Sequence, residues 1–361
     1  MEGKHLFTPG PVKVAPHVLE EMAKSLISHR GREFQELYTE TTRILEDISH
    51  TPQGGHALLV PGSGTTAVDA MVMSLLTPND RVLVPVWGEF GERLATTVSL
   101  SGAETIVKEY PPGTAPPVEE LVEYAERYNV TAVALVHNET GTGLAYRGLE
   151  ELARKLRGLG VRLLVDSVSG FAGEAIRVDW GIHAMATCTH KALWAPPGLG
   201  IVIISPEAAE ALEREPPTRA PASIDLARYL KFKTQRRETP FTPPVNVMRA
   251  LRRALADIVE EGGVERRIET HARRAEVLYR LEEEGAEPLV RDRVLRSNTV
   301  VALRTHTDAT RVKETLEARG FVVAAGMGAL KKTIVRIGTM GAHSMEVVER
   351  LAEAVREAIV G

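Results

Sequence analysis

The sequence predicts an α/β protein in which a mostly parallel sheet lies between helices, with a smaller α+β unit towards the C-terminus. In the first part of the chain, short runs rich in Val and Leu alternate with amphipathic stretches of helical period. The short runs are apolar at successive positions, which is typical of strands buried on both faces of a parallel sheet. Strands that alternate with helices in this way favour an open sheet covered by helices on both sides.

The expected elements of this first part follow the alternation closely. Strands are expected at His56–Pro61, Arg81–Val86, Glu104–Lys108, Thr131–Val136, Arg162–Val168, Ala184–Cys188 and Ile201–Ile204. Amphipathic helices are expected between them, among others at Thr65–Leu76, Val118–Tyr128 and Leu149–Leu159.

The second part of the chain breaks this rhythm. The Pro- and Arg-rich region Pro216–Pro244 is expected to be irregular, and a long helical region, Val245–Glu284, follows it. The smaller unit is expected to contain strands at Thr299–Leu303, Phe321–Ala324 and Thr333–Ile337, with helices at Ala309–Arg319 and Ser344–Ile359. We therefore expect a large domain over 21–245 and a small domain over 246–361, joined by the N-terminal segment 1–20.

Composition excludes several classes of protein. The 361 residues carry a net charge of −4 with acids and bases mixed, which argues against a nucleic-acid partner. A single cysteine, Cys188, excludes an intramolecular disulfide and a multi-cysteine metal site, and no metal is expected. Neither a secretory leader nor an apolar run of about 20 residues is visible, so we expect a cytoplasmic protein that does not enter membranes.

A candidate phosphate seat follows the first strand, at Pro61-Gly62-Ser63-Gly64-Thr65-Thr66. Glycines let the backbone approach a ligand closely, and a helix N-terminus presents free N–H groups to an anion. Ser63 and Thr65 add hydroxyl groups. The alternative interpretation is an ordinary helix capped by a hydroxyl side chain, and this segment alone favours neither.

Asp166 ends a very apolar strand, at the edge of the sheet where open α/β proteins bind ligands. A buried carboxylate needs a charge or a donor to meet it, and a protonated pyridine nitrogen would serve. Val168 lies two residues later and is expected on the same side. The alternative for Asp166 is a cap for the next helix.

Lys191 follows the next strand, beside His190 and just before a Pro-Pro-Gly turn. Most lysines are surface residues, and in isolation that is the better interpretation. However, a phosphate seat, a strand-end aspartate and a lysine one strand later match the phosphate, the ring nitrogen and the aldehyde of pyridoxal 5'-phosphate. This combination predicts a pyridoxal-phosphate enzyme in which Lys191 and Asp166 are the catalytic residues.

At this point the chain resembles a known family, the class V aminotransferases of fold type I, over nearly its whole length. The alanine–glyoxylate, serine–pyruvate and serine–glyoxylate enzymes are the most similar group. The resemblance rests on Phe7–Pro11, Gly62–Thr65, Val86-Trp87-Gly88, His137–Gly143, Asp166-Ser167-Val168, His190-Lys191-Ala192, Thr239–Pro244 and Val335–Gly338.

The resemblance implies further roles. Lys191 would carry the cofactor as a Schiff base, Trp87 would stack on the ring, and Thr140 would bond its phenolic oxygen. Thr239 and Thr242 belong to a loop that reaches the phosphate of a neighbouring subunit, with Thr239 where some members carry tyrosine. Ser63, Gly64, Thr65, Val168 and His190 complete the expected cofactor site.

Substrate contacts are implied as well. Arg336 would grip the α-carboxylate of the substrate, and Gly10 would lie near it. The reaction expected is ping-pong transamination from a small amino acid, alanine or serine, to a 2-oxo acid, glyoxylate or pyruvate, in a homodimer with shared active sites.

Other activities remain open from the sequence. Aspartate or phosphoserine is the second choice of substrate, and some segments also resemble aminoethylphosphonate transaminases. A lyase or desulfurase on the same fold is a further alternative, although Cys188 lies just before the lysine and is expected to be buried. A non-catalytic α/β module with accidental motif matches is the last.

Overall fold

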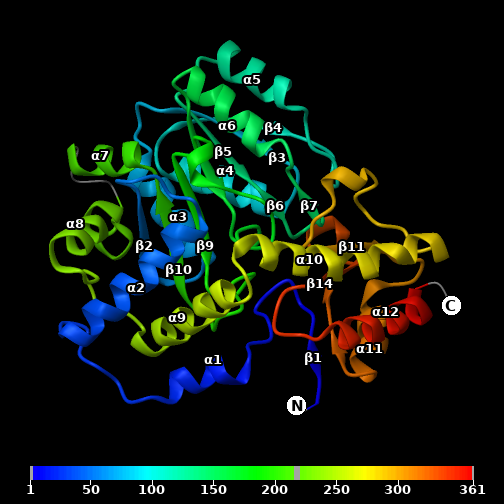
Figure 1. Cartoon of the computed structure of the whole chain (residues 1–361). Coiled ribbons are helices and arrows are strands. Elements are labelled where there is room, and N and C mark those ends of the chain that lie inside the picture. The colour runs from blue at the N-terminus through cyan, green and yellow to red at the C-terminus, as the bar shows by residue number, and fades with distance from the viewer. Residues whose placement is uncertain (1–2, 215–219, 360–361) are drawn as a thin grey trace.

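A seven-stranded sheet forms the centre of the protein, whose structure, a computed structural model, describes residues 3–214 and 220–359 (Figure 1). The strand order is β2-β10-β9-β8-β5-β3-β4. β10 runs antiparallel to its neighbours β2 and β9, and the remaining pairs are parallel. The bounds are β2 His56–Gly62, β3 Arg81–Val86, β4 Glu104–Glu109, β5 Ala132–Val136, β8 Arg162–Asp166, β9 Ala184–Cys188 and β10 Gly198–Ile204. The predicted α/β class is confirmed, and every expected strand of the sheet is present.

Helices cover both faces of this sheet. One face packs against α2 (Arg32–Ile48), α5 (Val118–Arg127), α6 (Leu149–Gly158) and α9 (Val245–Glu260). The opposite face packs against α3 (Gly64–Leu75), α4 (Glu89–Leu100), α7 (Pro206–Arg214) and α8 (Leu226–Arg236). We call these the α2 face and the α3 face.

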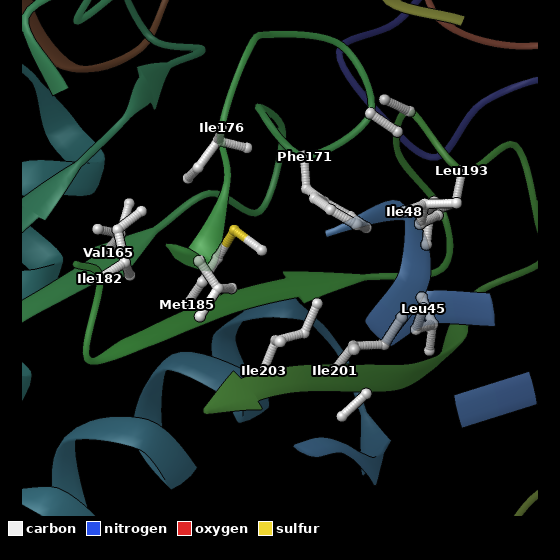
Figure 2. Packing of buried hydrophobic residues seen from close by; sticks show 14 of the residues in the cluster. Leu45, Ile48, Val165, Phe171, Ile176, Ile182, Met185, Leu193, Ile201 and Ile203 are labelled. Atoms are coloured by element: carbon white, nitrogen blue, oxygen red, sulfur yellow. The ribbon is translucent and has the colours of Figure 1, made fainter. Parts of the chain in front are cut away.

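Alternation along each strand sends successive side chains to different faces. Leu163 and Val165 of β8 belong to the core under α2, whereas Leu164 belongs to the core under α3. Figure 2 shows the α2-face core, in which Val165 and Met185 of the sheet lie near Phe171 and Ile176 of the loop that follows β8. The position of a residue along its strand therefore determines whether its side chain lies on the α2 face or on the α3 face.

The C-terminal part builds a smaller unit around the antiparallel sheet β11-β14-β13. Its elements are β11 Val300–Arg304, β13 Ala324–Ala325, β14 Ile334–Gly338, α10 Val264–Tyr279, α11 Ala309–Ala318 and α12 Met345–Ile359. The N-terminal strand β1 (His5–Leu6) pairs in parallel with β12 (Phe321–Val322), and α1 (Pro16–Glu20) packs on α9. Figure 1 shows the blue N-terminal segment beside these orange and red elements. The exact domain boundaries stay a prediction.

The helical region expected at Val245–Glu284 is confirmed, whereas the region expected to be irregular contains a helix. The long helical region is two helices, α9 and α10, separated at Gly262 and Gly263, which both have positive φ, and it ends in a 3-10 turn at Arg280–Glu284. The region Pro216–Pro244 is not wholly irregular, because α8 lies within it; residues 215–219 lie outside the described part. Asp225 caps α8 by accepting the N–H of Ala227 (3.1 Å), and the buried Leu226, Tyr229 and Leu230 form its apolar face.

Within the described ranges, no helix is long and apolar enough to span a bilayer. Those ranges also contain no cluster of three or more His, Cys, Asp or Glu side chains that could hold a metal ion.

Candidate active site

Five loops meet at the edge of the sheet where the parallel strands end. They follow β2, β3, β5, β8 and β9, and they carry most of the residues that the sequence singled out. Because parallel strands present their carboxyl ends at the same edge, segments far apart in the chain converge there. The structure thus brings the phosphate seat, the aspartate and the lysine to one place.

The segment predicted to hold a phosphate forms a capped helix start, and its phosphate-binding role stays a prediction. Ser63 precedes α3, and its hydroxyl accepts the N–H of Thr66 while the Thr66 hydroxyl accepts the N–H of Ser63 (3.1 Å). Thr65 is exposed in the first turn. A Cβ on Gly64 would lie 2.5 Å from Cγ1 of Val168, so only glycine lets the helix start and the Asp166 loop pack this closely.

Asp166 is buried and only partly compensated. Its Oδ1 accepts the N–H of Val168 at 2.9 Å. Burial raises the pKa of Asp166 to about 6, although the Val168 N–H and the charge of Lys191 oppose this rise. Asp166 shares the α3 face with Leu164, two residues earlier. A cationic ring nitrogen beside this carboxylate would supply the charge that the site lacks.

Lys191 lies in a crowded and largely buried position. Its Nζ donates to the carbonyl of Pro9 at 2.5 Å, and burial lowers its pKa, as does the charge of Arg336. A Cβ on Gly10 would lie 2.5 Å from the same Nζ, and Gly10 has φ +128°. The N-terminal segment therefore covers the lysine, and a lowered pKa favours the neutral, nucleophilic amine.

Arg336 reaches this edge from β14 of the smaller unit. Its Nε donates to the carbonyl of Ala325 (2.8 Å) and its Nη1 to the carbonyl of Thr140 (3.1 Å). Arg336 forms no direct ion pair with any carboxylate of the described residues. The guanidinium is thus held by neutral carbonyls, and its charge remains available for an anion.

The expectation that Trp87 stacks on the cofactor disagrees with the structure. Trp87 is 1% exposed, belongs to the α2-face core, and stacks on Tyr146 with ring centroids 5.2 Å apart. The cause is strand parity: Val86 packs on the α3 face with Val84, so the next side chain turns to the opposite face. The sequence does not show at which residue β3 ends, so it could not show to which face of the sheet Trp87 points.

Phe90 is an aromatic residue on the α3 face, the face that Asp166 shares. It lies in the first turn of α4, is partly exposed, and packs with Val168 against the α3-face core. The sequence pattern favoured Trp87 instead, because the tryptophan follows β3 directly and Phe90 comes three residues later.

His190 and Cys188 lie beside the lysine in uncharged form. Burial lowers the pKa of His190 to about 4 and raises the pKa of the Cys188 thiol to about 12. Cys188 is fully buried, and its Sγ lies 3.6 Å from Nε2 of His190. The expected burial of this cysteine is confirmed.

Arg30, which precedes α2, holds the loop at 239–244 through hydrogen bonds and an ion pair with the residue before it. Arg30 donates to the carbonyls of Thr239 (2.6 Å) and Pro240 (3.0 Å) and pairs with Glu238 (2.7 Å). The Thr239 hydroxyl is used inside the loop, where it donates to the carbonyl of Phe241 (2.7 Å). Thr242 is exposed, and its hydroxyl lies 3.5 Å from Nε2 of His29.

Comparison with known proteins agrees with this geometry. The family model for class V aminotransferases matches residues 6–351. The chain belongs to the class V aminotransferases. It is therefore an aminotransferase, its fold is that of the fold type I enzymes, and pyridoxal phosphate is its cofactor.

Three similar proteins illustrate the range of relatives. An uncharacterized aminotransferase from Methanocaldococcus jannaschii is 34% identical over 94% of this chain and 88% of its own length. The alanine–glyoxylate aminotransferase of Oryctolagus cuniculus is 31% identical over 98% of this chain and 92% of its own. The crystal structure of an aspartate aminotransferase of subgroup IV from Thermus thermophilus is 32% identical, with a TM-score of 0.89 and 98% of both chains covered.

The chain's own side chains fit pyridoxal phosphate. A partly compensated buried carboxylate faces the site from Asp166, a buried amine faces it from Lys191, and α3 presents its N-terminus beside Val168. These groups match the ring nitrogen, the aldehyde and the phosphate of the cofactor in charge and chemistry.

Proposed function

We propose that this aminotransferase transfers the amino group of alanine or serine to glyoxylate or pyruvate, with Lys191 as the cofactor lysine. The observation that carries the catalytic assignment is the amine of Lys191, buried at the carboxyl edge of the sheet beside Asp166. The relatives named alanine–glyoxylate and serine–glyoxylate aminotransferase support these substrates.

In this proposal each group of the site has one task. Ser63, Gly64 and Thr65 hold the phosphate at the start of α3, Asp166 holds the ring nitrogen protonated, and Thr140 bonds the phenolic oxygen. His190 adjoins the lysine, and Thr239 and Thr242 contribute their loop to a second subunit's site in a homodimer. The bound cofactor supplies an electron sink for the substrate's Cα.

Phe90 takes the stacking role that the sequence gave to Trp87. It lies on the same face as Asp166 and Val168, whereas Trp87 lies on the other. Val168 would then contact one side of the ring and Phe90 the other.

Lys191 is proposed to move the substrate proton. Burial lowers the pKa of Lys191, so the neutral amine that a general base requires is more accessible than in an exposed lysine. Arg336 would orient the substrate by binding its α-carboxylate, and the lack of a side chain at Gly10 leaves space for the lysine side chain. A ping-pong sequence follows from this use of one site by donor and acceptor in turn.

The charge around Arg336 favours a donor with a neutral side chain. The nearby negative groups are Glu139 and Glu89, which support the charge of Arg336. A second carboxylate on the substrate would meet these acidic groups, so aspartate should bind less well than alanine or serine.

Aspartate or phosphoserine remains the second candidate. The Thermus thermophilus relative named aspartate aminotransferase supports aspartate through its 32% identity and its coverage of 98% of both chains. A desulfurase is disfavoured, because the only cysteine is fully buried and its raised pKa keeps it a thiol.

The deciding experiment is a single-turnover donor series on the purified holoenzyme. Alanine, serine, aspartate and phosphoserine are mixed in turn with enzyme, and the loss of the visible cofactor band is followed. We expect alanine and serine to react at least about tenfold more efficiently than aspartate, which is the discrimination of one favourable polar contact. Faster reaction with aspartate or phosphoserine would reject the substrate assignment and leave the aminotransferase activity intact.

A further inference from the structure

Glu139 is a buried carboxylate for which the reaction described above has no use. It follows β5 in the short strand β6 (Asn138–Glu139), which pairs with β7 (Leu144–Ala145) in a tight hairpin. Its side chain is 0% exposed. Burying a carboxylate costs its hydration, and this cost must be offset by hydrogen bonds or by an opposite charge.

The partners of Glu139 are three backbone N–H groups from two different segments. Oε2 accepts from Phe90 (3.1 Å) and Gly91 (3.2 Å) in the first turn of α4, and Oε1 accepts from Gly141 (2.9 Å) at the hairpin tip. The carboxylate thus joins the segment that carries Phe90 to the residue next to Thr140. Acceptors of this kind satisfy N–H groups that a helix start leaves free.

The backbone of two glycines packs closely against the Glu139 carboxylate. A Cβ on Gly88 would lie 2.5 Å from Cδ of Glu139, and one on Gly141 would lie 2.7 Å from its Oε1. Glycine backbone therefore encloses the carboxylate on two sides. A side chain at either glycine would displace the carboxylate from its three N–H partners.

Arg336 depends on the same hairpin tip. It donates to the carbonyl of Thr140, and the negative charge of Glu139 supports its own charge. Because Glu139 uses its oxygens on backbone N–H groups, it gives Arg336 a favourable field without occupying the guanidinium. Two groups with opposite charge that formed a direct ion pair would instead leave no place for a substrate carboxylate.

We propose that Glu139 is a positioning residue that couples the cofactor contacts of Phe90 and Thr140 to the carboxylate-binding arginine Arg336. The inference rests on the proposed roles of these three residues. It adds that one carboxylate sets their mutual placement, so removal of its charge affects cofactor and substrate binding together.

Burial and the three hydrogen bonds have opposite effects on the charge of Glu139. Burial raises the pKa of Glu139 to about 7, with Asp166 adding to the rise and the three N–H groups opposing it. The charged groups around it are Asp166 from β8, Glu89 from α4 and Arg336 from β14.

The test compares Glu139→Gln with Glu174→Gln in the holoenzyme. Glu174 is an equally buried carboxylate that pairs with Arg147 (2.6 Å) and accepts the N–H of Asn298 (2.6 Å), away from Lys191 and Arg336. For both variants, the melting temperature, KM, kcat and the cofactor dissociation constant from the visible band are measured.

We expect both variants to melt at lower temperature, but only Glu139→Gln to raise the KM for the amino donor and the cofactor dissociation constant. Each should rise about tenfold, the effect of losing one charge-assisted hydrogen bond. A lower melting temperature with unchanged KM and unchanged cofactor binding in Glu139→Gln would overturn the proposal.

Gly141→Ala provides a second test if Glu139→Gln does not fold. The added methyl group displaces the carboxylate and keeps its charge, and we expect KM and cofactor binding to weaken in the same direction, by about threefold. A folded Gly141→Ala protein with wild-type values for both would reject the coupling. Transamination by the wild type is measured in parallel, so failure of the coupling and failure of the proposed function are distinguishable.

Discussion

The two faces of the central sheet differ in what happens where the strands end. On the α2 face the apolar core continues past the strand ends, so Trp87 stacks on Tyr146 and is almost fully buried. On the α3 face the same edge holds Val168, which follows Asp166, and the partly exposed Phe90. A shift of one residue in strand parity therefore separates a structural aromatic residue from one that can meet a ligand.

The first way to test this difference is to remove each aromatic ring in turn. We expect Trp87→Ala to lower the free energy of unfolding by about 3–5 kcal/mol, as other buried large-to-small changes do. Phe90→Ala should change it much less, because its side chain is already partly exposed. Thermal or denaturant unfolding of the cofactor-free proteins measures both values.

Cofactor affinity should depend more on Phe90 than on Trp87. Phe90→Ala is expected to weaken pyridoxal phosphate binding by about tenfold, through the loss of one aromatic stacking contact. A folded Trp87 variant, such as Trp87→Phe, should bind the cofactor almost as the wild type does. If Trp87→Phe lost the cofactor and Phe90→Ala kept it, the assignment of the two faces would be wrong.

The next prediction concerns the charge on the α3 face. Asp166→Asn keeps the shape of the side chain and the bond to Val168 but removes the negative charge. We expect kcat to fall about 10²–10³-fold, which is the usual effect of losing one preorganised electrostatic contact in an active site. Steady-state kinetics at saturating cofactor checks this, and near-normal kcat would mean that Asp166 has only a structural role.

The same substitution should stabilise the cofactor-free protein. Burial raises the pKa of Asp166 from 3.8 to about 6 in the folded state, so the folded protein binds a proton more tightly than the unfolded chain does. Stability of the wild type should therefore fall as pH rises from about 4 to 6 and then remain low.

Asp166→Asn removes this titration, and at pH 7 the variant should be more stable by roughly 2–3 kcal/mol. The advantage should shrink as the pH falls towards 4. A variant that is less stable than the wild type at pH 7, both without cofactor, would contradict the physical account of this carboxylate.

The sequence alone was sufficient for the parts of the site that depend on local patterns. The strand before Asp166, the glycine-rich start of α3, and Lys191 one strand later are all set by short stretches whose apolar period is clear. Arg336 could be chosen because apolar neighbours flank it. The family resemblance then supplied the cofactor that these groups share.

Other features depend on contacts that no local pattern contains. The carbonyl of Pro9 accepts a hydrogen bond from Lys191, which is 182 residues away in the sequence. The N-terminal segment is held nearby by the pairing of β1 with β12 and by the bond from Gly338 N–H to the Phe7 carbonyl. Phe90 was missed because its role depends on the residue at which β3 ends. Glu139 lies within the His137–Gly143 segment, but its contacts with α4 form only in the folded chain.

The central claim is that Lys191 carries the cofactor. Borohydride reduction of the purified holoenzyme, followed by proteolysis and mass spectrometry, tests it most directly, with Lys191→Ala as the control. We predict that the visible band disappears on reduction and that the reduced cofactor is found on the peptide containing Lys191, with no adduct in the variant. An adduct on another lysine, or none in the cofactor-saturated wild type, would contradict the account.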